Sequence, residues 1–225
     1  MSPPLLITHA HLLDPAVGAH SDTSWLEVAD GRISATGTGS PPPAGSDTRM
    51  INAAGATVMP GLIDAHVHLL LTTLGLADAN TWTPGYATVR ALAEAKRMLR
   101  RGFTTVRDVG GADYGMARAI DEGLALGPRL IFGGKALSQT GGHGDLRTKG
   151  DDTVPCCEAR PGFARIADGV DEVRRAARDE FRKGAAHLKM LLSGGVASPL
   201  DEVSEVQYSD EEMCAAVQEA DNHNR

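Results

Sequence analysis

The stretch "VMPGLIDAHVHLL", from Val58 to Leu70, separates two parts of the sequence that have different patterns. Before it, residues 1–57 consist of short extended runs joined by turns, and the Asp30-Gly31 pair between two such runs is a strong hairpin signal. After it, extended runs alternate with helical runs about four times. We therefore predict a small β unit over residues 1–57 and an α/β region over residues 58–225.

The helices of the second part have local start signals. Thr83-Pro84 begins a helix that runs to Gly102, and Ser209 with Glu212 three residues later forms a capping pattern. Two further helices are expected at 113–123 and 170–184. The strands expected between them are Gly61–Ala65, Phe103–Asp108, Pro128–Leu137 and Ala185–Gly195, with a long loop from Ser138 to Gly169. Such alternation predicts a parallel sheet, whose chemistry lies at the carboxyl ends of the strands.

Composition excludes several classes of protein. The 225 residues have a formal charge of −7, from 29 acidic and 22 basic side chains, which argues against a nucleic-acid partner. The cysteines, Cys156, Cys157 and Cys214, are odd in number and a poor disulfide framework, so a reduced cytoplasmic setting is expected. The N-terminus has no secretory pattern, and the most apolar segment, Leu69–Ala77, is far shorter than the ~20 residues of a membrane span. We expect a protein without a membrane partner.

Two histidines, His66 and His68, end the first strand of the α/β region. Residues i and i+2 of a strand face the same side, so both imidazoles can reach one metal ion at about 2.0–2.1 Å. Two histidines packed near a loop would give the same pattern. The pair is therefore a candidate metal site that needs further ligands.

Lys189 lies inside the last apolar run, between Leu188 and Met190. Burying a charged lysine is costly, so its side chain either reaches water or has a lowered pKa. A neutral amine could add carbon dioxide and become a carbamate, an oxygen ligand able to bridge two metal ions. His187 would share its face and ranks below Lys189 as a ligand.

Two more strand ends have polar residues. Asp108 could orient a metal ligand or a loop, and a structural role as a cap or ion-pair partner is favoured. His143 lies among glycines in "SQTGGHGD", Ser138 to Asp145, where backbone can approach a ligand closely. His143 would then bind substrate or polarise a carbonyl, and the alternative is a surface loop with an incidental histidine.

Taken together, four segments resemble the amidohydrolase superfamily of metal-dependent hydrolases. They are "PGLIDAHVHL", "GFTTVRDVGG", "GPRLIFGGKALSQTGGHGD" and "GAAHLKMLLSGGVASP", in the family's order over about Ala54 to Pro199. The branch that the chain resembles most contains Xaa-Pro dipeptidases, prolidase-like enzymes and imidazolonepropionase-related proteins. "TGGHGD" and "LKMLLSGGV" are similar to the dipeptidase group with two metals and a carbamylated lysine.

The resemblance implies a (β/α)8 TIM-like barrel beside a small N-terminal β-sandwich, with residues 58–225 as the first half of the barrel. His66 and His68 would bind the more buried of two divalent metals, expected to be zinc. Lys189, as a carbamate formed with carbon dioxide, would bridge both metals. A metal-bound hydroxide would attack the amide carbonyl of a dipeptide or other small molecule, and His143 would contact that substrate.

The family's site needs more residues than this chain contains. Two further histidines belong to the fifth and sixth strands, and an aspartate of the eighth strand binds metal and transfers the proton. A full barrel takes ~250 residues, and this pattern reaches only its fourth helix before Arg225. We therefore identify no catalytic acid or base here and expect an N-terminal fragment that is inactive alone, folds weakly, and aggregates or forms a homo-oligomer.

Three functions remain as alternatives. The first is hydrolysis of an amide or dipeptide C–N bond with two metals. The second is hydrolysis of a cyclic amide or imide, as in imidazolonepropionase-like enzymes, or of an N-acyl compound, with either one or two metals. The third is a non-catalytic, truncated remnant. Imidazole and carbamate ligands suit zinc, with manganese, cobalt and iron as alternatives.

Overall fold

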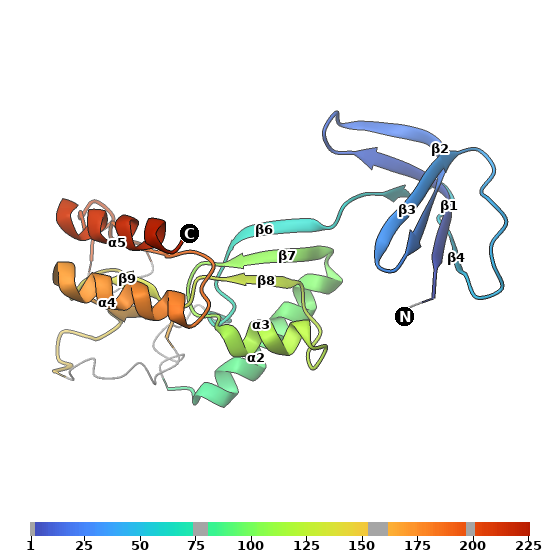
Figure 1. The fold of residues 1–225 in the computed structure, drawn as a ribbon. Helices are drawn as coiled ribbons and strands as arrows, with labels where there is room; N and C mark the ends of the chain where they lie inside the picture. Colours follow the sequence, from blue (N-terminus) through green and yellow to red (C-terminus); the bar gives the residue numbers. More distant parts are fainter. Residues whose placement is uncertain (1–2, 74–80, 153–161, 197–200) are drawn as a thin grey trace. The chain divides into compact units, whose positions relative to one another are not determined.

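The computed structural model describes residues 3–73, 81–152, 162–196 and 201–225 (Figure 1). The chain divides into two compact units, Met1–Gly61 and Leu62–Arg225. The cysteines Cys156 and Cys157 and the end of the Ser193–Pro199 loop lie outside the described residues. No helix among the described residues has the length and apolar character needed to cross a bilayer.

The first unit contains a five-stranded sheet with the order β3-β2-β1-β4, in which β5 also pairs with β1. Its strands are β1 (Leu5–Asp14), β2 (Ala19–Ala29), β3 (Arg32–Thr38), β4 (Arg49–Asn52) and β5 (Thr57–Val58). The β2–β3 hairpin turns at Asp30 and Gly31, which both have positive φ, 50° and 72°. A two-residue hairpin turn of type I′ requires that backbone, so the predicted hairpin is confirmed.

The second unit has a mixed α/β fold built on parallel strands. One sheet has the order β6-β7-β8, and β9 and β10 form a second. The strands are β6 (Leu62–Val67), β7 (Phe103–Asp108), β8 (Arg129–Phe132), β9 (Ala136–Ser138) and β10 (Ala164–Ile166). The helices are α2 (Pro84–Arg100), α3 (Tyr114–Asp121), α4 (Gly169–Arg182) and α5 (Asp210–Asn222).

Local signals set the helix starts. Thr83 caps α2, where its side chain accepts the Tyr86 N–H and proline occupies the first turn. Ser209 and Glu212 form a complete capping box at α5. Both predicted helix starts are confirmed. Each could be predicted because it depends on residues within one turn of the helix.

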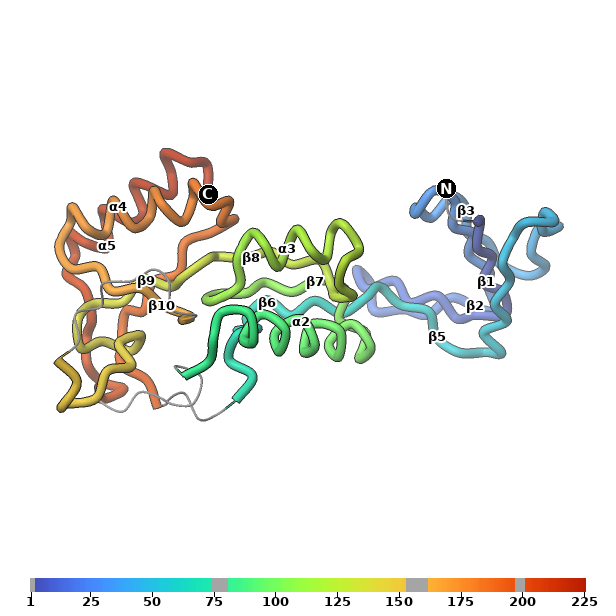
Figure 2. Tube along the Cα trace, turned by 90° about the horizontal axis from the view of Figure 1, so that it is seen from below, coloured from blue at the N-terminus to red at the C-terminus, as the bar shows by residue number. Residues whose placement is uncertain are grey.

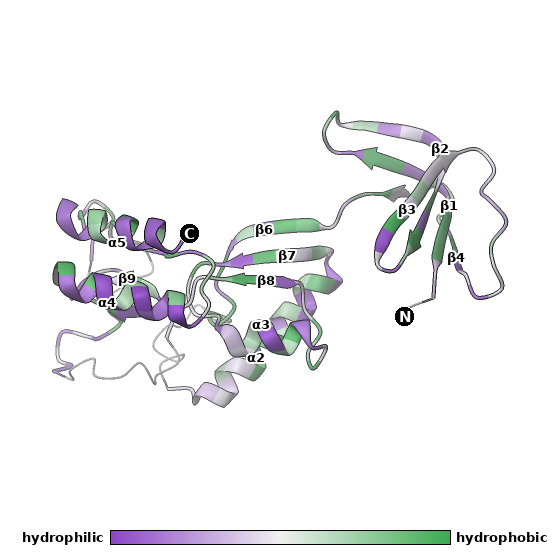
Figure 3. Ribbon diagram, in the orientation of Figure 1, coloured by the Kyte–Doolittle hydropathy of each residue, from purple (hydrophilic) through white to green (hydrophobic). Residues whose placement is uncertain are grey.

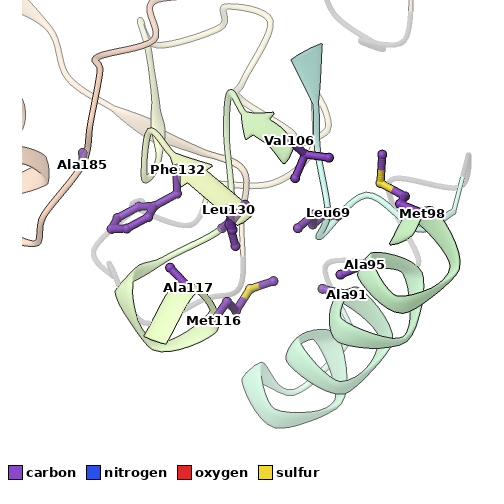
Figure 4. Packing of buried hydrophobic residues seen from close by; sticks show 11 residues of the cluster. Leu69, Ala91, Ala95, Met98, Val106, Met116, Ala117, Leu130, Phe132 and Ala185 are labelled. Atoms are coloured by element: carbon purple, nitrogen blue, oxygen red, sulfur yellow. The ribbon is translucent and has the colours of Figure 1, made fainter. Parts of the chain in front are cut away.

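The core of the second unit lies between the β6-β7-β8 sheet and the helices α2 and α3, which pack on one face of it (Figures 1 and 2). Val106 and Leu130 of neighbouring strands meet Ala91 and Ala95 of α2 and Met116 of α3 (Figure 4). Small residues on α2 allow the helix to approach the strands closely.

In the described part of the chain, the face of the β6-β7-β8 sheet that points away from α2 and α3 is not covered by a helix core. Arg107 and Ile131 pair across β7 and β8, and each follows a core residue, so alternation directs them away from α2 and α3. Ile63 of β6 pairs with Thr105 and is 70% exposed. This face thus presents apolar and basic side chains to solvent in the described chain.

Helices α4 and α5 pack on each other through an apolar cluster that includes Val173 and Ala215. Figure 3 shows hydrophilic residues along both helices outside this contact. The buried carboxylate of Glu219 accepts from Arg174 at 2.8 Å and from Arg178 at 2.7 Å. An ion-pair group therefore joins the two helices beside their apolar contact.

The expected single strand Pro128–Leu137 is wrong, because it is broken into β8 and β9. Gly134 takes a positive φ of 71° at the break, and the buried Glu180 carboxylate accepts the Lys135 N–H at 3.2 Å. A carboxylate from α4, distant in sequence, thus replaces a strand partner. No local signal in the sequence indicates that contact.

The expected strand Ala185–Gly195 was predicted too long. This stretch bonds to its neighbours at a few points, where Ala186 donates to Phe132 O at 2.9 Å and Leu137 donates to Lys189 O at 2.8 Å. Within it, isolated bridges at Met190 and Ser193 are the only strand pairing among the described residues. Conversely, β10 lies inside the stretch predicted as loop.

Candidate metal and substrate site

His66 and His68 lie together at the carboxyl end of β6. Their ring centroids are 5.6 Å apart and their planes make an angle of 71°. His66 is the second-last residue of β6 and is exposed. His68 directly follows β6 and is half-buried. The strand therefore offers both imidazoles at the edge where chemistry is found in parallel α/β folds.

The ring of His68 is fixed by its neighbours. Its Nδ1 lies 3.0 Å from the carbonyl oxygen of Gly110. A carbonyl only accepts, so Nδ1 carries the proton and Nε2 keeps the lone pair that a metal ion would need. The Phe163 ring packs against the same imidazole in a T-shaped arrangement, with the ring centroids 5.7 Å apart. Neither Gly110 nor Phe163 was identified from the sequence.

Asp108 holds two loops through backbone hydrogen bonds, whereas the sequence favoured a role as a helix cap or an ion-pair partner. Its side chain is fully buried and accepts the N–H groups of Leu69 at 2.6 Å, Gly110 at 2.9 Å and Ala112 at 3.1 Å. Burial raises the pKa of Asp108, and the three backbone donors oppose that rise. The carboxylate thus joins the loop after His68 to the loop that supplies its carbonyl partner.

The charge of Lys189 acts on His66. The pKa of His66 is lowered by burial and then by the positive charges of Lys189, His68 and Arg107. Lys189 is 123 positions from His66 in the sequence (189 − 66), yet its charge is among those that act on the His66 imidazole. No hydrogen bond or ion pair to this amine forms within the described residues.

His187 is half-buried and lies against Gly133, where an added Cβ would be 2.6 Å from its Nε2. Neither ring nitrogen has a hydrogen-bond partner in the described chain. Burial, followed by the charges of Arg107 and Lys189, lowers the pKa of His187. The positive charges of Arg107 and Lys189 thus act on both His187 and His66.

Arg107 is a member of this neighbourhood that the sequence analysis overlooked. Its Nε donates to the carbonyl of Ala65 at 2.8 Å, which ties β7 to β6 beside His66. A basic residue at a strand end usually points to solvent, so the residue type of Arg107 did not indicate a site. Its position in the strand did, because Arg107 follows the core residue Val106 and so faces away from the helices.

His143 contacts a different set of residues. Its backbone N–H donates to Gln207 Oε1 at 3.0 Å, and its Nδ1 lies 3.7 Å from Asp201 Oδ2. Its ring lies on Gly195, where a Cβ would come within 2.2 Å of it. Within the described residues, the polar contacts of His143 therefore run to residues 201–207 and not to His66, His68 or Lys189.

By residue type, His66, His68 and Lys189 are the candidate ligands of a divalent metal. Among the described residues, no three His, Cys, Asp or Glu side chains gather closely enough to hold an ion. Two imidazole nitrogens with one carbamate oxygen from Lys189 would complete a set that suits zinc. The lone pair left on Nε2 of His68 agrees with that reading.

Comparison with known proteins decides the family. The model of the amidohydrolase family matches residues 57–225. The chain belongs to the amidohydrolase family. The amidohydrolase match covers the whole second unit, which carries each of the candidate site residues.

Relatives within the amidohydrolases agree with the branch expected from the sequence. Ochratoxinase of Aspergillus niger is 35% identical over 246 residues, 97% of this chain and 48% of the relative. A prolidase solved with N-methylphosphonate-L-proline has a TM-score of 0.92 at 42% identity, over 98% of this chain and 54% of that one. A Xaa-Pro dipeptidase with bound methionine has a TM-score of 0.85 at 28% identity, over 98% and 55%. The chain spans about half the length of these relatives.

Proposed function

We propose that the protein is a metal-dependent amidohydrolase that cleaves an amide C–N bond in a dipeptide, with Xaa-Pro dipeptides as the preferred class. The observation that carries the proposal is the pairing of His66 and His68, 5.6 Å apart, with the Lys189 charge acting on His66. Similarity to a prolidase and to a Xaa-Pro dipeptidase over nearly the whole chain supports the substrate class.

In this proposal, His66 and His68 would hold a metal through their ring nitrogens, and Lys189, as a carbamate, would supply oxygen ligands. When bound, divalent metals lower the pKa of a water molecule to near neutrality and polarise a carbonyl group. The Gly110 carbonyl keeps the proton of His68 on Nδ1, so that Nε2 stays available as a ligand atom.

His143 would bind the substrate from the loop after β9, held by residues 201–207. The amide nitrogen needs a proton as the C–N bond breaks. By the family resemblance, an aspartate of a later strand would supply that proton, so the activity belongs to a chain of the relatives' length. The 225-residue chain alone is expected to be inactive.

The test compares metal content and hydrolysis of a dipeptide panel by the full-length protein and by its variants. We expect about two ions per chain and turnover of Xaa-Pro dipeptides. His66→Asn, His68→Asn and Lys189→Met should each lose metal and reduce turnover to the background rate. His20→Asn is the matched control, because His20 is exposed on β2 in the first unit.

The outcomes separate the alternatives. A folded full-length protein that binds no metal at neutral pH contradicts the proposal. Turnover of cyclic amides without turnover of linear dipeptides favours the imidazolonepropionase-like alternative. Tight binding of two ions with turnover by the 225-residue chain would contradict the expectation that this chain is inactive alone.

A further inference from the structure

Two glutamines join the loop that carries His143 to residues 201–208. One belongs to the loop and accepts from the 201–208 segment, and the other belongs to that segment and accepts from the loop. Gln139, which follows β9, accepts the backbone N–H of Tyr208 at 2.6 Å. Gln207 accepts the backbone N–H of His143 at 3.0 Å and is 1% exposed. The loop is therefore fixed at both of its sides by buried or half-buried amides.

Gln207 differs from Gln139 because it also holds a carboxylate. Its Nε2 donates to Asp201 Oδ2 at 2.9 Å, and the Asp201 side chain is fully buried. The same oxygen lies 3.7 Å from Nδ1 of His143, a distance too long for a hydrogen bond. Hydrogen bonds at functional sites are often long without substrate and shorten when it binds.

The His143 ring has little room to turn away from this carboxylate. It lies against Gly195, where a Cβ would be 2.2 Å from Cε1, 2.5 Å from Nδ1 and 2.7 Å from Nε2. Nδ1 is buried and has no hydrogen-bond partner among the described residues. The carboxylate of Asp201 is the charged acceptor placed on that side of the ring.

We propose that Asp201, held by Gln207, keeps a proton on Nδ1 of His143 and leaves Nε2 as the nitrogen that meets the substrate. Asp201 and Gln207 are then positioning residues, because they act through His143 and not on the substrate. This inference rests on the proposed function, in which His143 binds substrate. A histidine ring that could exchange its two tautomers would present the wrong nitrogen part of the time.

The direct test is long-range ¹H–¹⁵N spectroscopy of the full-length protein labelled with ¹⁵N at histidine. The His143 signals are identified by their loss in His143→Gln. At a pH where the ring is neutral, the wild-type protein should show the proton on Nδ1. Asp201→Leu and Gln207→Leu should move it toward Nε2, since the first removes the acceptor and the second removes the amide that holds the acceptor in place.

Two further variants distinguish positioning from a structural role. Gln139→Leu loosens the same loop without touching Asp201, so the proton should stay on Nδ1. Asp201→Asn should also keep it there, because the Gln207 amide selects the oxygen of the new side chain as its acceptor. If Asp201→Leu does not fold, Gln207→Leu compared with Gln139→Leu decides the question.

The proposal is wrong if wild-type His143 carries its proton on Nε2, or if Gln207→Leu and Gln139→Leu give the same tautomer. Hydrolysis gives a second measure: Asp201→Leu and Gln207→Leu should raise KM about tenfold, the loss of one hydrogen bond to substrate, with less change in kcat. Metal content should not change in either. Absence of metal in the wild-type protein would contradict the proposed function while leaving the tautomer result standing.

Discussion

The carboxylate of Asp108, at the end of β7, accepts the backbone N–H of Leu69 at 2.6 Å. Leu69 directly follows His68, so this bond fixes the chain where it leaves the candidate metal site. The same carboxylate holds the N–H of Gly110, whose carbonyl accepts from His68. One buried side chain thus controls both the backbone and the ring partner of a proposed ligand.

Replacing Asp108 with alanine should leave three buried N–H groups without an acceptor. We expect the free energy of unfolding to fall by about 3 kcal/mol, measured by urea denaturation. Asp108→Asn keeps one oxygen and should lose less, about 1 kcal/mol. Equal stability of the alanine variant and the wild-type protein would show that these bonds do not hold the loop.

Gly110→Ala should weaken metal binding. A Cβ at this position would lie 2.8 Å from the Phe163 carbonyl oxygen and 3.3 Å from the His68 ring, so the Gly110 carbonyl must shift. Loss of such a ligand-orienting partner lowers metal affinity by about 10–100-fold, measured by competition with a chelator. Gly85→Ala is the control, because no atom lies within 4 Å of its added Cβ. Similar affinities in the two variants would contradict the assigned role of the carbonyl.

Glu219 should make stability depend on pH in the acid range. Its hydrogen bonds with Arg178 and then Arg174 lower its pKa from 4.5 to about 2. A carboxylate with a lowered pKa stabilises the fold above its unfolded pKa, and that stabilisation is lost as pH falls from 4.5 toward 2. The wild-type Tm should therefore fall more steeply than that of Glu219→Gln over this interval.

The exposed Glu205 gives the matched control for that experiment, since it lies outside α4 and α5. Glu205→Gln should keep the wild-type slope. Parallel Tm curves for Glu219→Gln and the wild-type protein would mean that the ion pairs between α4 and α5 add nothing to stability.

The isolated 225-residue chain should self-associate through the sheet face opposite α2 and α3. Ile63 on this face is 70% exposed, and apolar sheet faces in water promote association. Sedimentation velocity should show species larger than 23.6 kDa at micromolar concentration. Ile63→Lys should reduce them, whereas Val17→Lys, at an exposed site of the first unit, should not. A monomer with a sharp thermal transition would contradict this expectation.

The sequence predicted those parts of the fold that short-range chemistry determines. The hairpin at Asp30-Gly31 and the helix starts at Thr83 and Ser209 depend on neighbouring residues and agree with the structure. The break after β8 depends on Glu180, 45 positions from the N–H that it accepts. No periodicity or turn signal near residue 135 indicates such a distant partner.

The same distinction holds at the candidate site. His66 and His68 could be placed together because a strand repeats every two residues. Their supporting groups could not, since Gly110 O is 42 positions from His68 and Gln207 is 64 positions from His143. Asp and Gln in "DEVSEVQYS" look like ordinary loop residues until the fold buries them.

The positive charges that surround His66 have a practical consequence for preparing the protein. Arg107 and Lys189 both act on this imidazole, so the neighbourhood attracts small anions when no ion offsets its charge. A phosphate buffer would fill it with a competitor and take up divalent ions besides. Under the proposed function, carbon dioxide in equilibrium with dilute bicarbonate would supply the carbamate of Lys189, so a non-phosphate buffer with dilute bicarbonate during metal loading should favour the loaded form.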